Sequence, residues 1–400
     1  MAVSKGALDG LFVLDLSRIL AGPTCTQLLG DLGATVIKVE NPQTNGDDTR
    51  GWGPHYATDA NGEKTDLSAY FMAANRNKRS IAVDIATEEG QRTLRHLAAR
   101  ADVVIENFKP DGLKRYGLDH ATLLGAHPGL VYCSISGFGQ TGPNRSQPGY
   151  DLMAQGFGGI MSITGDPDGA PTKVGVGIAD VMCGMYATIG ILAALRHRDA
   201  TGEGQHIDLA LVDASMAWLV NEGVNTLISG QDPVRRGNAH PNIVPYDAFA
   251  AADGHILLAV GNDAQFARFC DALEIPGVAQ DPRFVTNLGR IENREALMPL
   301  ISPAMAALPK AALLDRLHNV NVPCGPIHTI GEALSSPQAQ ARGAVVTLDL
   351  PDPDAPPVQL LGNPLKFSAT PVRYDRAPPR FRQDTDEVLE TWGPKSDAPR

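Results

Sequence analysis

Asp180 is the side chain whose type and surroundings are best suited to covalent chemistry. It follows the glycine-containing segment 175–179 and precedes a long apolar stretch typical of a buried helix. One interpretation is structural, because an aspartate here can cap a helix by accepting hydrogen bonds from its first N–H groups. The other is catalytic, because a carboxylate at a helix N-terminus beside glycines can attack the acyl carbon of an approaching thioester. Composition leaves both interpretations open.

Basic and amide side chains flank two of the predicted strands. The run Asn75–Arg79 lies directly before one strand, and Asn107–Pro110 directly follows another. Ligands of open parallel sheets bind at sheet edges, outside the carboxyl ends of the strands. Lysine and arginine can pair with phosphates there, and Phe108 can pack on a flat base. Taken alone, each run is explained more simply as solvated surface charge.

Several other chemistries lack their motifs. Glu40 ends the second predicted strand, where a ribose-binding acid would stand, but the first turn, Arg18–Pro23, lacks the glycines of a dinucleotide site. The ten histidines are dispersed without a His-Glu-x-x-His run, and the Gly-x-Ser-x-Gly elbow is absent. Cys25 has no evident activating base and is interpreted as a buried thiol. We therefore expect no metal site and no nicotinamide chemistry.

The elements that must position these residues predict an α/β fold. Apolar runs predict strands at 11–16, 35–40, 80–84, 103–108, 130–136 and 206–211. Helical patterns alternate with them at 23–33, 87–101, 151–157 and 181–196. This alternation indicates a Rossmann-like large domain with a mostly parallel sheet between helices.

The rest of the chain predicts a second, smaller α+β domain. Its hairpin is expected at 246–251 and 255–260, and its helices at 264–273, 295–307 and 310–318. We expect the large domain to span 1–225, the small domain 226–330, and a C-terminal segment 331–400 to return to the large domain. The proline-rich part of that segment, 351–379, is interpreted as an extended strap.

The composition limits the partners and the compartment. The 34 basic and 45 acidic residues give a net charge of −11, which argues against binding to nucleic acid or to an anionic membrane. The five cysteines are widely separated, so a disulfide framework is not expected and a reducing compartment fits. The stretch 1–10 has neither the apolar core of a signal peptide nor the character of a transit peptide. These features predict a cytoplasmic protein.

Short segments spread along nearly the whole chain resemble those of one enzyme family, the class III CoA-transferases of the formyl-CoA and carnitine-CoA type. They are Val13–Leu16, Leu20–Pro23, Gly33–Glu40, Asn77–Ile81, Glu106–Phe108, Gly137–Gly139, Gly149–Asp151 and the segment around Asp180. Each match is weak alone, and the ordered set carries the resemblance. The overall likeness is greatest to the succinate–hydroxymethylglutarate type, which points to dicarboxylic acids.

The resemblance implies a reaction and a set of binding residues. Asp180 would attack the donor thioester, and the released CoA would return to form an aspartyl-CoA thioester that an acceptor carboxylate then attacks. CoA would be a substrate and product, with no permanently bound cofactor. The implied CoA contacts are Leu20, Ala21, Lys78, Arg79, Asn107, Phe108, Arg115 and Tyr150, and Gly261, Asn262 and Asp263 stand at the family's substrate-covering glycine loop with fewer glycines. Asn41 stands where some members have an arginine. Family members form interlocked homodimers.

Two rival functions share the resemblance. The racemase branch of the fold moves an α-proton of a 2-methylacyl-CoA with a histidine and an aspartate. Its histidine belongs to a Gly-His-Asp triplet, where this chain has Tyr150 between Gly149 and Asp151, so a base that titrates near neutral pH is missing. The chain could also be a silent acyl-CoA-binding protein in which Asp180 only caps a helix. The transferase is favoured over both.

Overall fold

The computed structural model describes residues 5–394 and divides them into two compact units. The larger unit holds the described parts of 1–161, 173–231 and 338–400, and the smaller unit holds 162–172 and 232–337. The observed divisions after 231 and 337 lie a few residues beyond those expected from the sequence, and the smaller unit also takes in a segment from the middle of the predicted large domain. The extreme ends of the predicted domains, 1–4 and 395–400, lie outside the described residues.

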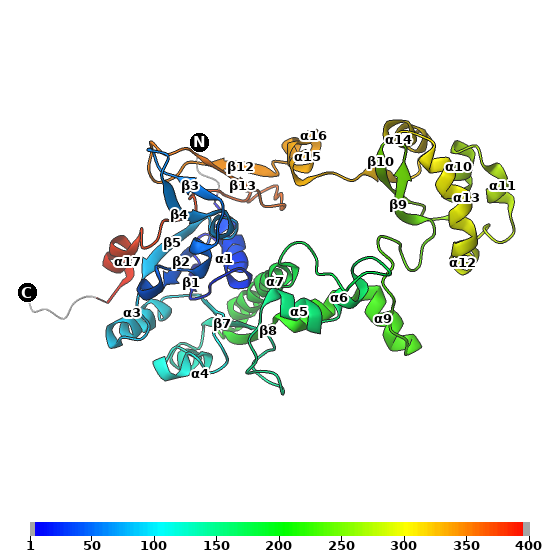
Figure 1. The fold of residues 1–400 in the computed structure, drawn as a ribbon. Helices are drawn as coiled ribbons and strands as arrows, with labels where there is room; N and C mark the ends of the chain where they lie inside the picture. The colour runs from blue at the N-terminus through cyan, green and yellow to red at the C-terminus, as the bar shows by residue number, and fades with distance from the viewer. Residues whose placement is uncertain (1–4, 395–400) are drawn as a thin grey trace, which may run out of the picture. The chain divides into compact units, whose positions relative to one another are not determined.

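A six-stranded parallel sheet forms the centre of the larger unit (Figure 1). The strands run in the order β5-β2-β1-β6-β7-β8. Their bounds are β1 Phe12–Asp15, β2 Thr35–Glu40, β5 Lys78–Ala82, β6 Val103–Glu106, β7 Val131–Ser136 and β8 Gln205–Ala210. The chain passes from β1 to one side through β2 and β5, then returns to pair β6 with the other side of β1. Such a reversal opens a crevice at the carboxyl ends of β1 and β6. The predicted α/β fold is confirmed.

Helices cover both faces of this sheet because both faces of its strands are apolar. All four residues of β6 are buried, and neighbouring residues of β1 belong to different cores, Val13 to one and Leu14 to the other. The first core is completed by α1 Ala21–Asp31, α5 Asp151–Phe157, α7 Ile178–Thr201 and α8 Leu211–Ala217. The second is completed by α3 Glu88–Ala98, α4 His120–Ala126 and α17 Thr385–Trp392.

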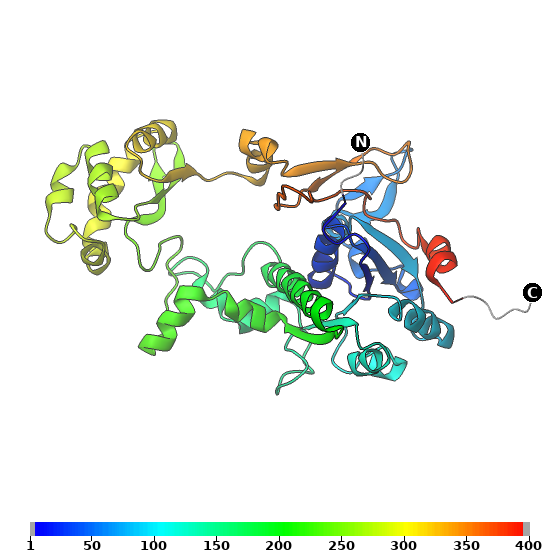
Figure 2. The ribbon, with the colours of Figure 1, turned by 180° about the vertical axis from the view of Figure 1, so that it is seen from behind.

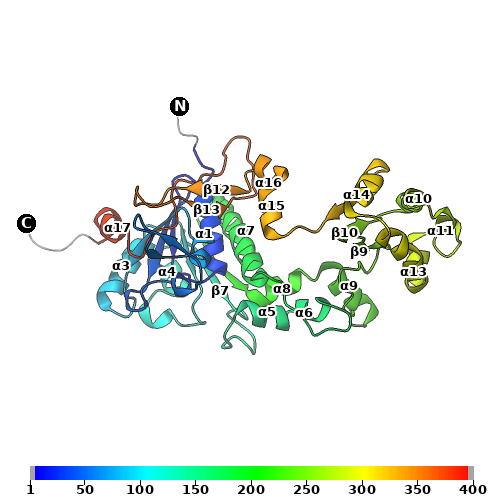
Figure 3. The ribbon, with the colours of Figure 1, turned by 45° about the horizontal axis from the view of Figure 1, so that its top comes forward.

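Helix α7 is the longest apolar element and packs against α1 (Figure 3). By length and composition it could cross a membrane, as could the pair α13 and α14 if its 113° bend were one broken span. Half of the most apolar window of α7 is buried, and the helix also contacts α8, β7 and β8. These contacts are those of a core helix in the larger unit.

Shorter elements complete the larger unit. A hairpin of β3 Tyr56–Thr58 and β4 Lys64–Ser68 precedes α2 Ala69–Met72, and α9 Val220–Ser229 follows α8. The predicted proline-rich strap contains the second strand of an unpredicted antiparallel hairpin, β12 Val345–Leu348 with β13 Val358–Leu361. After it, backbone groups of Arg373 and Asp375 bond the side chain of Asn77. The C-terminal segment therefore packs on the larger unit.

The smaller unit has an antiparallel sheet in the order β11-β10-β9, covered by helices (Figure 2). Its strands are β9 Tyr246–Ala251, β10 Gly254–Ala259 and β11 Cys324–Pro326. Its helices are α10 Asp263–Ala272, α11 Pro276–Gln280, α12 Asn287–Glu292, α13 Arg294–Ala306, α14 Lys310–Asn319 and α15 Ile330–Ser335, while α6 Ile160–Ile163 and α16 Pro337–Ala341 lie at the unit boundaries. Phe249, Phe266, Phe269 and Leu297 belong to its core.

Candidate functional site

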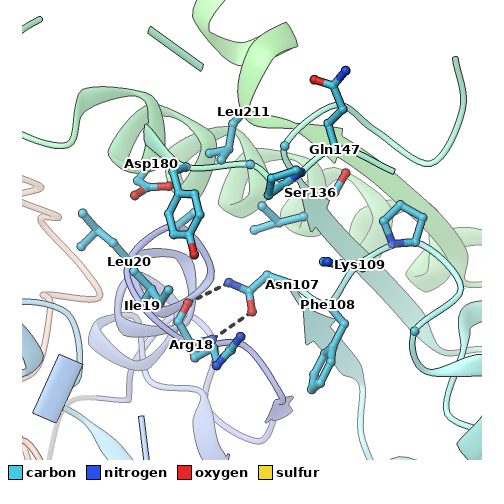
Figure 4. A pocket seen from close by; sticks show the side chains of 18 of the residues that line it. Arg18, Ile19, Leu20, Asn107, Phe108, Lys109, Ser136, Gln147, Asp180 and Leu211 are labelled. Carbon is cyan, nitrogen blue, oxygen red and sulfur yellow. Dashed lines mark hydrogen bonds between the residues drawn. The ribbon is translucent and has the colours of Figure 1, made fainter. Parts of the chain in front are cut away.

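A cavity of roughly 430 Å³ opens at the carboxyl ends of β1, β6 and β7 (Figure 4). The turn after β1, the loop after β6 and the segment 147–150 line its sides. Seven of the predicted site residues line it: Leu20, Ala21, Asn107, Phe108, Arg115, Tyr150 and Asp180. The crevice at the strand reversal is therefore a formed pocket within the larger unit.

Asp180 is the third residue of α7, and it does not cap that helix. The N-cap is Gly177, because α7 begins at Ile178 rather than at the expected residue 181. Within residues 5–394 the Asp180 carboxylate has no hydrogen-bond donor, although only 9% of the residue is exposed. Burial, and then the charge of Asp151, raises the pKa of Asp180 to about 7. The capping interpretation is therefore wrong, and no hydrogen bond within these residues occupies the carboxylate.

Close packing of α7 on α1 places Asp180 beside the turn that follows β1. Gly184 lies one helical turn after Asp180, and a Cβ there would lie 2.6 Å from the carbonyl oxygen of Ala21. A Cβ on Gly177 would lie 3.1 Å from Cδ2 of Leu20. A larger residue at position 184 would push the two helices apart, and one at position 177 would make the Leu20 side chain shift by a few tenths of an ångström. Both glycines therefore allow the nucleophile candidate to lie against Leu20 and Ala21.

The turn Arg18–Leu20 is held from two sides. The Asn107 side chain accepts a hydrogen bond from Arg18 N at 3.0 Å and donates one to Arg18 O at 2.7 Å (Figure 4). The next residue, Ile19, has a φ of 74°, which is strained for a β-branched side chain. Its N–H donates to the carboxylate of Asp47, 3.2 Å away. Asn107 therefore uses its amide to fix the cavity wall.

A buried ion pair supports this strained turn. The Asp47 carboxylate lies 2.8 Å from the ammonium of Lys38, and both side chains are almost fully buried. Lys38 also donates to the carbonyl oxygen of Ser17. No side chain caps the start of α1 at Leu20, so the positive end of that helix faces the cavity.

Cationic side chains gather along the cavity. Arg115 and Lys109 line it together with Arg18, which pairs with the exposed Asp48. The guanidinium of Arg115 lies 4.5 Å from the ring centre of Tyr116. Such groups can pair with phosphates. Arg18 was not among the predicted site residues, although its place shortly after β1 was a usable signal.

Lys78 and Arg79 do not reach the cavity. They begin β5 and so lie at its amino end, whereas the pocket is at the carboxyl ends of the strands. The Lys78 ammonium is fully buried and donates to Asp15, Asn75 and the carbonyl of Pro23. Burial, partly offset by Asp15, lowers the pKa of Lys78 to about 8. Arg79 pairs with Glu387 on α17 at 2.7 Å.

Two further residues near the site had no role in the sequence analysis. Glu106 ends β6, where burial raises its pKa to about 7 and where its carboxylate accepts the N–H of Phe108 at 2.8 Å. Tyr70 on α2 lies near enough to Asp180 and Asp151 for their charges to add to the effect of burial in raising its pKa. Tyr70 is far from Asp180 in sequence, so no local pattern pointed to it.

The predicted loop residues Gly261–Asp263 lie in the smaller unit, directly after β10. Asn262 is the N-cap of α10 and accepts the N–H of Gln265, and Gly261 N donates to the Gln265 side chain. Asp263 pairs with the buried Arg290 at 2.9 Å. Their part in covering a substrate stays a prediction.

Among residues 5–394 no group of three or more His, Cys, Asp or Glu side chains is placed to hold a metal ion. Cys25 is buried, and burial raises its thiol pKa to about 12. Such a thiol is not a nucleophile at neutral pH. The groups in the cavity that can take part in chemistry are therefore the Asp180 carboxylate, the Tyr150 hydroxyl and several cationic side chains.

Comparison with known proteins gives the class of this site. The family model for CoA-transferase family III matches residues 8–385. A succinate–glutarate CoA-transferase of Agrobacterium fabrum is 48% identical over 96% of this chain and 95% of that protein. A succinyl-CoA:mesaconate CoA-transferase of Haloarcula hispanica is 40% identical over 97% of each chain. The crystal structure of a CAIB/BAIF family protein from Brucella suis has a TM-score of 0.84 and 46% identity, over 97% of this chain and all of that one.

These matches show an enzyme of the transferase type. The chain belongs to CoA-transferase family III, as the resemblance of its motifs predicted.

Proposed function

We propose that this enzyme moves CoA from a succinyl-CoA-like donor to a dicarboxylic acid through a thioester on Asp180. The observation that carries the proposal is the Asp180 carboxylate itself, which lines the cavity without a hydrogen-bond donor among the described residues. Carboxylates used structurally in this chain, such as Asp15 and Asp31, are instead fully engaged by cations and hydroxyl or amide groups. A largely buried carboxylate without hydrogen-bond donors can act as a nucleophile when it is ionised.

The reaction balances without any added cofactor. The ionised Asp180 attacks the donor thioester carbonyl, and the C–S bond breaks to give a mixed anhydride and CoA thiolate. The thiolate attacks the aspartyl carbonyl, which forms aspartyl-CoA and frees the donor acid. The acceptor carboxylate attacks this thioester, and the returning thiolate cleaves the second anhydride at the acceptor carbonyl. Acyl-CoA leaves, and the carboxylate is regenerated.

The cavity offers partners for both ends of an acyl-CoA. Arg18, Lys109 and Arg115 can pair with the phosphates of CoA. The uncapped start of α1, at Leu20 and Ala21, can donate N–H groups to an oxyanion beside Asp180. Tyr150 has an exposed hydroxyl-bearing ring at the same wall and can donate to an anhydride oxygen. The dicarboxylic acceptor follows from the names of the relatives.

We also propose that the active form is a homodimer, as the resemblance implies. Three helices of the larger unit expose large apolar side chains: Leu152, Met153 and Phe157 on α5, Met185 and Ile189 on α7, and Val220, Val224, Leu227 and Ile228 on α9. Extended apolar surface of this kind is typical of interfaces. Size-exclusion chromatography with light scattering should give twice the monomer mass of 42.4 kDa. A monomer at micromolar concentration would contradict the dimer.

The transferase is tested by incubating the enzyme with succinyl-CoA and glutarate and resolving the CoA esters by chromatography. We expect glutaryl-CoA from the wild type and none from Asp180→Ala. Asp119→Ala removes a carboxylate that caps α4 outside the cavity and should keep normal turnover. A folded Asp180→Ala variant with normal turnover would refute the assignment.

A further inference from the structure

The segment that leads into Asp180 is tied at both ends to helix α5. At its start, Val174 N–H donates to Oε1 of Gln155 at 2.9 Å. At its end, Ala179 N–H donates to Oδ1 of Asp151 at 2.8 Å. Nε2 of Gln155 donates to Oδ2 of Asp151 at 2.7 Å and so connects the two ties. Asp151 and Gln155 are one turn apart on α5 and can therefore act together.

The segment between these ties has little structure of its own. It contains Gly175 and Gly177, and the N-cap of the helix that follows is Gly177, which has no side chain to cap it. Gln155 is fully buried, so water cannot take over its hydrogen bonds if a partner is lost. The orientation of the Asp180 side chain at the start of α7 thus depends on the hydrogen bonds of Asp151 and Gln155.

The order of donors and acceptors in this network requires one carboxylate and one amide at the two positions. Both backbone N–H groups are donors, so they need acceptors at both ends. The oxygen of Gln155 accepts the N–H of Val174, so only its NH₂ group is left to bond Asp151. One oxygen of Asp151 must therefore accept from that NH₂ group, and the other accepts the N–H of Ala179. Only an ionised carboxylate accepts on both sides.

We propose that Asp151 and Gln155 are positioning residues for CoA transfer, which hold the glycine-containing segment 174–179 at both ends so that Asp180 faces the cavity. This inference rests on the proposed function of Asp180. Neither residue needs to touch the reacting atoms. Asp151 also has an electrostatic effect, because its charge adds to burial in raising the pKa of Asp180.

Exchanging the carboxylate and the amide between positions 151 and 155 tests whether the hydrogen-bond network itself, rather than either residue alone, is required. In Asp151→Asn, the new NH₂ group faces the NH₂ group of Gln155. If the Gln155 amide flipped to avoid this, its NH₂ group would face the N–H of Val174, and that hydrogen bond would be lost instead. In Gln155→Glu, two carboxylates face each other. In the double variant, which carries Asp151→Asn and Gln155→Glu together, the asparagine oxygen still accepts the N–H of Ala179. The asparagine NH₂ donates to the new glutamate, and the other oxygen of that glutamate accepts the N–H of Val174. All three hydrogen bonds return, and the total charge is unchanged.

We expect each single variant to lower kcat by about tenfold to a hundredfold, as the loss of one buried hydrogen bond predicts. The double variant should recover to within about threefold of the wild type. Thr87→Ala, which removes the cap of α3, is the control for an ordinary loss of helix stability and should keep the wild-type kcat. A double variant no more active than either single variant would overturn the proposal.

The pH dependence of the rate gives a readout that a purely structural role would not move. In the described part of the chain, three titratable groups interact electrostatically with Asp180: Asp151 on α5, Tyr70 on α2, and Cys183, which lies on α7 with Asp180. Tyr70 and Cys183 are uncharged near neutral pH because their pKa values are raised. Asp151→Asn should therefore shift the rising limb of the rate to lower pH, and an unshifted limb would contradict the electrostatic part.

Hydrogen exchange measures the attachment without any turnover. In Asp151→Asn the amide of Val174 or that of Ala179 should exchange at least about tenfold faster than in the wild type, because the two facing NH₂ groups are relieved only by breaking one of the ties. In the double variant both amides should return to wild-type rates. Unchanged exchange in the single variant would refute the positioning role. A wild type that makes no acyl-CoA product would instead refute the proposed function, and the exchange rates would still decide the inference.

Discussion

Replacing Asp180 by asparagine should stabilise the folded protein at alkaline pH while it abolishes transfer. Burial, with a contribution from Asp151, raises the pKa of this carboxyl from 3.8 to about 7. Above pH 7 the folded protein therefore holds a charge where charge is disfavoured. Asparagine has nearly the same shape and no charge, so it removes that destabilisation.

The magnitude follows from the two pKa values. They differ by about three pH units, and each unit corresponds to about 1.4 kcal/mol of unfolding free energy. Below about pH 4 the carboxyl is protonated in both states, so wild type and variant should be equally stable. From pH 4 to 7 the folded state keeps the proton that the unfolded state has lost, and the variant gains progressively. Above pH 7 its advantage should reach about 4 kcal/mol at most.

Urea unfolding followed by circular dichroism at pH 5 and pH 8 measures this difference. Asp119→Asn is the matched control: although partial desolvation opposes it, hydrogen bonds from Thr122 lower the pKa of Asp119, so asparagine there should not stabilise at pH 8. Equal stability of Asp180→Asn and wild type at both pH values would show that the Asp180 carboxylate is not held in a destabilising environment, and the reasoning would fail.

Three further substitutions test separate parts of the site. Tyr150→Phe should slow transfer by roughly tenfold to a hundredfold, as the loss of one hydrogen bond to a charged intermediate predicts, and the wild type should put no deuterium on the α-carbon of a 2-methylacyl-CoA in deuterium oxide; rapid deuteration would favour a racemase. Asn107→Ala removes both hydrogen bonds to Arg18 and should raise the KM for acyl-CoA by roughly tenfold, and an unchanged KM would refute the role of Asn107 in fixing the cavity wall. Lys78→Met leaves the buried Asp15 without its lysine partner and should cost about 3 kcal/mol or more in urea unfolding, whereas a neutral effect would contradict the structural role of this ion pair.

Local sequence patterns were sufficient for most of the parallel sheet. β2 spans Thr35–Glu40 and α5 spans Asp151–Phe157, as predicted, because apolar periodicity and local breakers define such elements. The hairpin of β12 and β13 was missed, since its strands are short and its second strand lies in a proline-rich stretch. Its pairing depends on contacts between distant segments, which periodicity does not reveal.

The site was predictable where residues directly follow strands and not where distant segments meet. Asn107 follows β6 and lines the cavity, but its two hydrogen bonds to the backbone of Arg18 depend on the pairing of β1 with β6. Lys78 was placed with the ligand because its run lies beside a strand, yet it begins that strand. The capping interpretation of Asp180 failed because α7 starts at Ile178, after a glycine that gave no sequence signal for a helix start.

The most direct test is to trap the activated carbonyl of Asp180 as a hydroxamate. The enzyme is incubated with succinyl-CoA alone, treated with hydroxylamine, digested and examined by mass spectrometry. Hydroxylamine converts an aspartyl thioester or anhydride to a hydroxamate, which adds about 15 Da to the peptide. We expect this adduct on Asp180 in the presence of succinyl-CoA and no adduct when the CoA ester is omitted. An active enzyme that gives no adduct on Asp180, or gives it on another residue, would show that Asp180 is not the nucleophile.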